Sequence, residues 1–311
     1  MMIKIKYTFA LLIIFLSVTV SCKKDDDNIP PPPPPRDRGE EAVRAQDSIE
    51  KFLETHYYNY LEFEADPDNF KIKFDTIPEG NTELIPLIEQ VTSKQVKDVI
   101  DPSVTYTLYY LVVREGGGEK PHFSDYTINT YEGRLFEDRK SIDLFDSSVI
   151  PVRFNLVDTP SSPGIIRGLQ QALIEFGGAS NIIENPDGTL TFENFGIGAV
   201  FIPSGLAYYQ YPPSNGDLSA YEQLIFSFEL FESEVADHDS DGVPSFMEDL
   251  NNNGYLLDDD TDGTGGANYL DNDDDNDGRR TEFEIEIDGN GNITFPDVDG
   301  DGIPDYLDAD S

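Results

Sequence analysis

Acidic side chains near the C-terminus recur in a fixed frame, with a spacing typical of oxygen ligands around a metal ion. Asp237, Asp239, Asp241, Gly242 and Glu248 fit the pattern D-x-D-x-D-G-x5-E. Alternate carboxylates gather hard oxygen atoms around one point, and the glycine permits a sharp turn, so the pattern suits Ca²⁺. The frame recurs three more times, which predicts a structural calcium segment with the ligands Asp237, Asp239, Asp241, Glu248, Asp249, Asn251, Asn253, Asp260, Asp273, Asp275, Asp277, Glu284, Asp297, Asp299, Asp301 and Asp308.

These frames differ from EF-hands because they leave no room for flanking helices. Asp249 follows Glu248 directly, and Pro244 and Pro304 stand where a helix would begin. The array instead resembles thrombospondin type 3-like calcium repeats. That resemblance implies successive loops that wrap around a row of ions with little apolar core. The alternative is a disordered acidic tail that only solvates the chain.

A second group of candidate residues is aromatic and apolar and lies in the middle of the chain. Five stretches stand in a fixed order: YEGRL at 131–135, FDSS at 145–148, IIRG at 165–168, IPSGLAY at 202–208 and LIFSFEL at 224–230. In their order and spacing, apart from insertions, residues 105–234 resemble an FKBP-type peptidyl-prolyl cis-trans isomerase domain. The resemblance implies isomerisation of X-Pro bonds in exported or cell-envelope proteins, proline-containing polypeptides as partners, and no cofactor for catalysis.

Carried over position by position, the resemblance also implies a proline-binding pocket. The Tyr208 hydroxyl and the Ile166 N–H would hold peptide carbonyls, and Asp146 would orient the pocket. Val152 and Leu169 stand where the family usually has aromatic residues, and the chain contains no tryptophan. The implied catalytic residues are Tyr131, Phe145, Asp146, Ile165, Ile166, Tyr208 and Phe226, and the implied substrate pocket adds Val152, Leu169, Ala207 and Phe228.

Two other classes of function remain open on the sequence. The middle region could be a catalytically weak FKBP-like module that binds proline-containing segments without turnover, on a calcium-stabilised surface protein. The calcium array could instead be the main function, as a spacer or adhesion element. An isomerisation assay distinguishes the binding module from an enzyme. A calcium titration tests whether the array binds the ion at all.

The pattern of apolar residues predicts the elements that must position these side chains. The fold class expected is α+β: a twisted antiparallel sheet wrapped on a short helix, followed by an irregular calcium-loop array. The short helix carries Ile166, Leu169, Leu173 and Phe176 on one face and stops at the glycine pair that follows. We also predict a helix over 40–60, a hairpin joining 182–183 to 190–192, and strands at 70–74, 105–113, 126–135, 152–156, 199–202 and 223–229.

The N-terminal residues resemble the export signal of a bacterial lipoprotein. Lys4 and Lys6 precede an apolar run, and the stretch TVSC at 19–22 resembles a lipobox, in which Cys22 is lipidated. The following KDDD at 24–27 resembles a surface-export tag, and six prolines at 30–35 predict a stiff spacer. We therefore expect an outer-membrane lipoprotein in the envelope of a Gram-negative bacterium, anchored in the membrane by lipid. The periplasmic and surface faces both remain open.

Negative charge is concentrated in the last quarter of the chain, and the net charge excludes one class of partner. Its 311 residues carry 61 acidic and 21 basic side chains, for a net charge of −40, which excludes ordinary nucleic-acid binding. Residues 237–311 hold 24 acidic side chains and two arginines, so 24 − 2 places −22 of that charge in the last quarter. The expected organisation is a signal peptide (1–21), a lipidated tether (22–36), a helix and strand extension (37–104), the isomerase domain (105–234) and the calcium repeats (235–311).

Overall fold

The computed structural model describes residues 34–67, 70–136, 144–214 and 218–311. The signal segment 1–21, Cys22, the stretch 24–27 and the prolines 30–33 lie outside the described residues. Contacts divide the chain into Met1–Pro35 and Arg36–Ser311, and the description below concerns the second unit. Within the described ranges no helix is long and apolar enough to cross a membrane.

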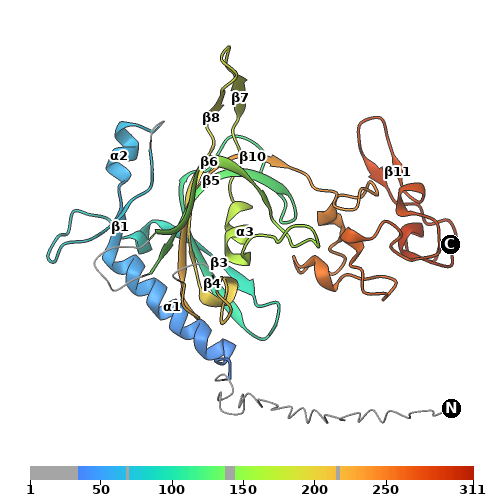
Figure 1. Cartoon of the computed structure of the whole chain (residues 1–311), viewed down its shortest axis with the longest axis horizontal. Coiled ribbons are helices and arrows are strands. Elements are labelled where there is room, and N and C mark those ends of the chain that lie inside the picture. Colours follow the sequence, from blue (N-terminus) through green and yellow to red (C-terminus); the bar gives the residue numbers. More distant parts are fainter. Residues whose placement is uncertain (1–33, 68–69, 137–143, 215–217) are drawn as a thin grey trace, which may run out of the picture. The chain divides into compact units, whose positions relative to one another are not determined.

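The second unit is built on a six-stranded antiparallel sheet that curves around a short helix (Figure 1). The strand order is β3-β4-β9-β10-β5-β6. β3 precedes residue 105 and pairs with β4, so the sheet extends to both sides of that expected boundary. The strands are β3 (Val91–Lys97), β4 (Thr105–Arg114), β5 (Tyr126–Leu135), β6 (Leu144–Asn155), β9 (Gly196–Ile202) and β10 (Leu224–Glu234).

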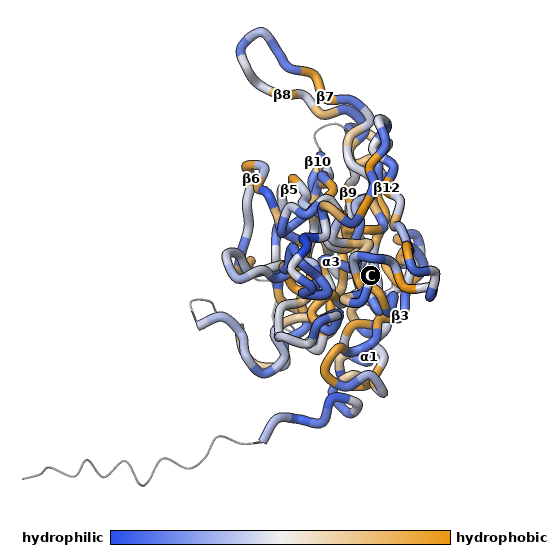
Figure 2. Tube along the Cα trace, turned by 90° about the vertical axis from the view of Figure 1, so that its right-hand side faces the viewer, coloured by the Kyte–Doolittle hydropathy of each residue, from blue (hydrophilic) through white to orange (hydrophobic). Residues whose placement is uncertain are grey.

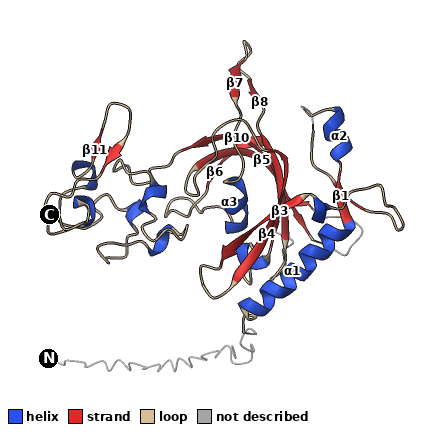
Figure 3. Ribbon diagram, turned by 180° about the vertical axis from the view of Figure 1, so that it is seen from behind, coloured by secondary structure: helices blue, strands red, loops and turns tan. Residues whose placement is uncertain are grey.

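A helix covers each face of this sheet. α3 (Arg167–Leu173) lies on the concave face, where Leu169 and Leu173 join an apolar cluster with Val200 and Phe228. α1 (Arg38–Thr55) packs on the opposite face through Ile49 and Leu53 (Figure 3). Every residue of β9 is buried because this central strand is covered on both faces.

The expected helix over 40–60 ends earlier than predicted, and the expected strand over 70–74 is wrong except at Phe74, because residues 70–73 are not in a strand. α1 ends at Thr55, and β1 (His56–Tyr58) pairs with β2 (Phe74–Thr76). Phe70 and Ile72 are buried, as the alternation predicts. The Asn59 side chain, however, bonds the Lys71 carbonyl at 3.0 Å and the Lys73 N–H at 2.8 Å, so it takes backbone groups that strand pairing would use.

The other predicted elements are present, several with longer bounds. The strands at 105–113 and 126–135 match β4 and β5, and the FDSS stretch with residues 152–155 forms the single long strand β6. A hairpin of β7 (Asn181–Glu184) and β8 (Leu190–Glu193) projects beyond the sheet (Figures 1 and 2). The remaining short helices of this part are α2 (Tyr60–Ala65), η1 (Leu87–Glu89) and η2 (Ser204–Leu206).

The acidic repeats fold as loops joined by single 3₁₀ turns. Residues 235–311, all described, contain no α-helix. Two small apolar clusters hold the loops: one around Val243 and Tyr306, the other around Leu256 and Tyr269. The elements are η3 (Ser245–Glu248), η4 (Leu256–Asp258), η5 (Asn268–Leu270), η6 (Thr281–Phe283), η7 (Asp305–Leu307), β11 (Glu286–Ile287) and β12 (Ile293–Thr294).

Candidate functional site

An aromatic wall stands on the concave face of the sheet. The Tyr131 hydroxyl donates a hydrogen bond to Asp146 Oδ2 at 3.0 Å. The Phe145 and Phe226 rings meet edge to face with centroids 5.6 Å apart, and the Tyr131 ring lies 6.2 Å from Phe226. Tyr131, Phe145, Asp146 and Phe226, which lie in three different sequence stretches, are therefore brought together.

The strand register and Gly133 bring these four side chains together. Gly133 pairs with Phe226 on β10 and with Asp146 on β6, so the three strands present these positions at one level. A Cβ atom at Gly133 would lie 2.8 Å from the Phe145 ring and 3.0 Å from the Phe226 ring. Any larger residue at Gly133 would push the wall apart. The sequence contains Gly133 within the YEGRL stretch, but this role appears only with the register.

Aliphatic and aromatic side chains form the floor beside this wall. Leu169 is 2% exposed, and Phe226 and Phe228 are similarly buried. Phe228 stacks edge to face on Phe176, with centroids 4.9 Å apart. Leu169, which the sequence predicts as a pocket residue, is thus buried on α3 beside the wall.

Four further predicted residues pack against the same cluster and stay half-buried: Ile165, Ile166, Ala207 and Tyr208. Ile166 precedes the first residue of α3, and no described residue accepts a hydrogen bond from its N–H. The Tyr208 hydroxyl likewise has no partner among the described residues. Both donors are available to a ligand.

Burial and Asp146 set the ionisation of both tyrosines. Burial, followed by the hydrogen bond to Asp146, raises the pKa of Tyr131 to about 12. Burial and then the negative charge of Asp146 raise the pKa of Tyr208. Both phenols therefore stay protonated at neutral pH and act as hydrogen-bond donors.

Val152 differs from these residues in its packing. It is half-buried on β6 and does not join the apolar cluster that contains Leu169 and Phe226. Phe154, on the same side of that strand, packs on the Tyr131 ring with centroids 5.2 Å apart. Reasoning from sequence missed Phe154, although an aromatic residue two positions from Val152 was a usable signal.

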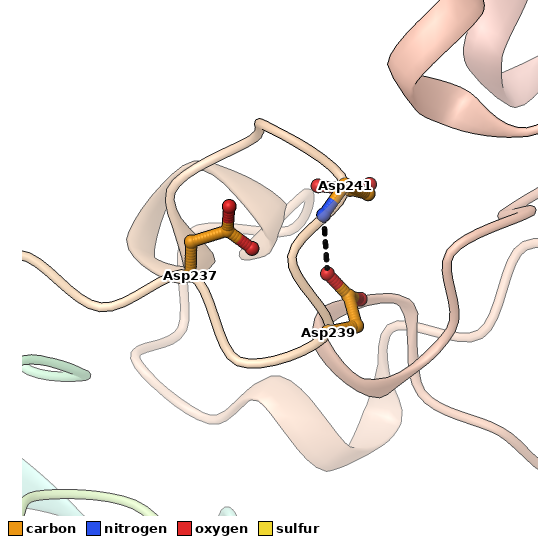
Figure 4. A group of neighbouring side chains, drawn as sticks. All are labelled: Asp237, Asp239 and Asp241. Carbon is orange, nitrogen blue, oxygen red and sulfur yellow. Dashed lines mark hydrogen bonds between the residues drawn. The ribbon is translucent and has the colours of Figure 1, made fainter.

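The first acidic frame closes into a tight loop, shown in Figure 4. The Asp237 carboxylate accepts hydrogen bonds from the Ser240 N–H at 2.8 Å and the Gly242 N–H at 3.1 Å. Asp239 accepts one from the Asp241 N–H at 3.3 Å, the dashed line of the figure. Oxygen atoms of Asp237, Asp239 and Asp241 lie within 4.8 Å of one another.

A second acidic group is buried and joins two frames. Oxygen atoms of Asp241, Glu248 and Asp274 lie within 4.8 Å of one another. Glu248 is 1% exposed, and neither of its carboxylate oxygens has a hydrogen-bond partner among the described residues. Burial, and then Asp239, Asp241 and Asp274, raise the pKa of Glu248 to about 11. A buried carboxylate among others of like charge is costly unless a cation accompanies it.

The third and fourth frames repeat parts of this geometry. Asp273, Asp275 and Asp277 form one group of neighbouring oxygens, and Asp297, Asp299 and Asp301 form another that is exposed. Glu284, at the end of the third frame, is 3% exposed, and its oxygens accept no hydrogen bond. The Asp308 carboxylate accepts a bond from the Asp310 N–H at 3.1 Å.

The second frame is less regular. Asp249 accepts bonds from the Asn253 N–H at 2.9 Å and the Gly254 N–H at 2.7 Å. Asn251 donates to Asp259, outside the predicted set, at 3.0 Å. Asp260 closes a separate turn by accepting from the Gly263 and Gly265 N–H groups.

Asp274 was not among the ligands predicted from sequence. It occupies an intervening position of the third frame, between Asp273 and Asp275, and is 2% exposed beside the first frame. The usable signal was the unbroken run of three aspartates at 273–275. Because Asp273 and Asp275 serve the turn of their own frame, the side chain of Asp274 between them points the other way. Only the fold shows which frame that side chain reaches.

Comparisons with known proteins match both regions in part. Residues 238–295 match the family described as BamM C-terminal, and no curated protein matches the chain. Among solved structures, the chain is similar to a peptidyl-prolyl cis-trans isomerase of Pseudomonas syringae pv. tomato, at 17% identity and a TM-score of 0.33, over 65% of this chain and 99% of that one.

Two further solved structures share part of their length with this chain. FkpA from Escherichia coli is similar at 21% identity and a TM-score of 0.33, over 63% of each chain. The FKBP domains of wheat FKBP73 are similar at 18% identity and a TM-score of 0.32, over 46% of this chain and 51% of that one. The chain thus spans less than two thirds of either protein.

Proposed function

We propose that the sheet region is an FKBP-type peptidyl-prolyl cis-trans isomerase that acts on X-Pro bonds. The observation that carries this proposal is the meeting of Tyr131, Phe145, Asp146 and Phe226 over the buried Leu169. These residues come from stretches whose order resembles that of the isomerase family. The half-buried Ile165, Ile166 and Tyr208 lie against the same cluster.

Isomerisation of an X-Pro bond makes and breaks no covalent bond. It therefore needs an apolar pocket and hydrogen-bond donors, which these residue types supply. Rotation about an X-Pro bond meets a barrier of about 18–20 kcal/mol, since the conjugation of the amide is lost on the way. The twisted amide is less polar than the planar one. An apolar pocket that grips the proline ring and excludes water therefore favours the transition state over the ground state.

Each polar group has a positioning task in this scheme. Asp146 holds the Tyr131 hydroxyl at 3.0 Å and so fixes the ring that borders the pocket. The Tyr208 hydroxyl and the Ile166 N–H, both without described partners, would donate to carbonyls of the bound peptide. No proton needs to move, which agrees with tyrosines whose pKa values are raised.

A proline-peptide isomerisation assay on the full chain tests the proposal. We expect catalysis that is lost in the double variant Asp146→Ala, Tyr208→Phe and kept in the matched variant Asp47→Ala, Tyr211→Phe, whose side chains are exposed. If wild type and double variant give the same rate, the enzyme proposal fails. If both still bind the peptide, the region is a binding module without turnover.

We further propose that the repeat region, residues 237–311, binds Ca²⁺. Supporting it is the buried Glu248, whose two oxygens have no hydrogen-bond donor and lie beside Asp241 and Asp274. When bound, Ca²⁺ would supply the positive charge that these oxygens lack. Asp237, Asp239 and Asp241 with Glu248, and Asp273, Asp275 and Asp277 with Glu284, are the sets that would hold it.

Calorimetric titration of the full chain with CaCl₂ tests this second proposal. Extracellular calcium modules bind with dissociation constants of about 0.1–1 mM, so saturation is expected in the low millimolar range. MgCl₂ is the control, because Mg²⁺ demands a smaller octahedral site. Absence of any calcium heat at these concentrations would leave residues 237–311 as an acidic segment without a metal.

We also propose that the chain is an envelope lipoprotein. Support comes from the apolar run that ends at the TVSC stretch, in which Cys22 would carry the lipid. Mass spectrometry of the protein from bacterial membranes tests it. The expected N-terminal fragment begins at Cys22 with added acyl mass, and a Cys22→Ser chain should leave the membrane fraction.

A further inference from the structure

The repeat region packs directly beside the N-terminal end of α3. Arg167 Nη1 donates a hydrogen bond to the Gly254 carbonyl at 3.0 Å. The Tyr269 hydroxyl donates to the carbonyl of Asp158, in the loop that leads to Ile165. Leu256 and Tyr269 pack with Val157, so apolar contacts accompany both bonds. The loop around 254–257 is therefore held at a fixed place next to the predicted pocket.

A cavity of about 350 Å³ lies between the two regions. Ile165, Ile166 and Ala207 line it from the sheet side, and Tyr255 and Leu257 line it from the repeats. Leu257 is 45% exposed, so this apolar side chain faces a space that protein atoms do not fill. The volume falls within the range of about 300–1,000 Å³ that is usual for ligand sites.

The cavity shares three residues with the predicted proline pocket. Ile165, Ile166 and Ala207 belong to the set that the isomerase resemblance assigns to substrate, and the same three side chains form one side of this cavity. A polypeptide whose proline occupies the pocket would run past these residues as it leaves. Its next side chains would then lie against Tyr255 and Leu257.

Charge favours a basic partner at this place. Asp158 lines the cavity, and Asp258 follows Leu257 directly. Arg167, the one cation among the described residues that line the cavity, is hydrogen-bonded to Gly254 and lies near Asp249 and Asp258. Asp158 on the lining and Asp258 beside it outnumber this single positive charge, so lysine or arginine in a bound segment would be attracted there.

We propose that Tyr255 and Leu257 form one wall of a second substrate subsite. Its occupant is a proline-containing polypeptide segment that places an apolar side chain, outside the X-Pro pair, between Leu257 and Ile165, with basic residues alongside. The repeat region thereby sets which prolines the sheet region acts on. This inference rests on the isomerase function proposed above.

Peptide binding to the full chain tests the subsite, with CaCl₂ present throughout. Fluorescence anisotropy compares labelled Ala-Pro peptides with two flanking lysines, in which one leucine is placed at successive positions before and after the X-Pro pair. We expect leucine at one position to tighten binding about tenfold over alanine, as burial of a leucine side chain implies. Replacement of the lysines by glutamates should weaken binding.

Variants of the repeat region test whether that region causes the leucine preference. Leu257→Ala should abolish the leucine preference, and Tyr255→Ala, as a second variant, should reduce it. Leu250→Ala is the matched control, because Leu250 is an equally exposed leucine of the same segment that does not line the cavity. Unchanged calcium binding shows that each variant is folded.

Two results would overturn the subsite. One is a leucine preference that Leu257→Ala leaves intact, and the other is wild-type binding that does not distinguish leucine from alanine at any position. Failure of the isomerase proposal would look different. In that case no peptide, including those with alanine alone, would be isomerised faster, while the binding comparison would still give its answer.

Discussion

Two buried carboxylates show how differently the sheet region and the repeat region are stabilised. Asp98, in the turn between β3 and β4, is 2% exposed, and Glu248, in the repeats, is 1% exposed. Asp98 accepts hydrogen bonds from Arg38, from the Tyr106 hydroxyl at 2.8 Å and from the Ile100 and Asp101 N–H groups. Glu248 accepts none.

The ionisation of the two groups follows from their partners. Burial tends to raise the pKa of Asp98, but its hydrogen bonds and Arg38 outweigh burial and lower it. At Glu248 burial acts with the neighbouring carboxylates and raises the pKa to about 11. The sheet region thus satisfies its own buried charge, whereas in the repeat region the proposed Ca²⁺ would supply the positive charge that Glu248 lacks.

The apolar cores of the two regions also differ, in size. The concave face of the sheet has a large cluster that includes Leu108, Leu173 and Phe176. The repeats have two small clusters, each built on three buried residues. Apolar burial can therefore account for the fold of the sheet region, whereas the repeats have little apolar core, which is the reason for proposing that ligation orders their loops.

Phe176→Ala gives the sharpest test of the apolar side of this comparison. Phe176 is 0% exposed and contacts Phe228 and Tyr110, so we expect a loss of about 3–5 kcal/mol in the unfolding free energy of the sheet region. Urea denaturation followed by tyrosine fluorescence measures it. Phe283→Ala, at a site that is 61% exposed in the repeats, is the control. A loss below about 1 kcal/mol for Phe176→Ala would contradict this account of the core.

Asp98→Ala tests the satisfied carboxylate. Removal leaves Arg38 and the Tyr106 hydroxyl without their partner, so we expect a loss of about 3 kcal/mol in unfolding free energy at pH 7. Because folding lowers the pKa of Asp98, its contribution is complete above the unfolded value of about 3.9 and disappears as pH falls through the lower folded value.

The pH profile separates this charge effect from simple loss of packing. The stability difference between wild type and Asp98→Ala should begin to shrink below about pH 4 and close as pH falls through the lower folded pKa of Asp98, while Asp47→Ala, at an exposed site on α1, should follow wild type at every pH. A difference between wild type and Asp98→Ala that stays constant down to pH 2 would show that charge is not the cause.

Glu248→Gln tests the unsatisfied carboxylate. We expect calcium affinity to fall by at least about 10–100-fold, the effect that loss of an outer-shell partner alone can have on a metal site. Calorimetric titration of the full chain measures it. Glu286→Gln is the matched control, because Glu286 is an exposed glutamate of the same region. Equal calcium affinity in the two variants would exclude Glu248 as a ligand.

Much of the sheet region could be predicted because its signals are local. Alternation within 105–113 and 126–135 defines β4 and β5, and the motif order brings Tyr131, Asp146 and Phe226 into one set. What could not be predicted depends on register and on distant partners. Asn59 replaces strand pairing at 71–73, and Phe154, which the motifs do not single out, packs on the Tyr131 ring.

The repeats were predictable as frames and unpredictable as an assembly. Within each frame the aspartate spacing fixes the turn, because the side chains bond backbone groups a few residues away. Asp274 reaches another frame, and residues 254–257 reach the sheet region, through packing that no local pattern encodes.

Amide hydrogen exchange of the full chain, with CaCl₂ and after chelation, tests the central contrast most directly. The account predicts that amides of residues 241–306 lose most of their protection when calcium is removed, while β4, β9 and β10 keep theirs, because only the first group depends on ligation. Protection that is the same in both regions, with and without calcium, would contradict it.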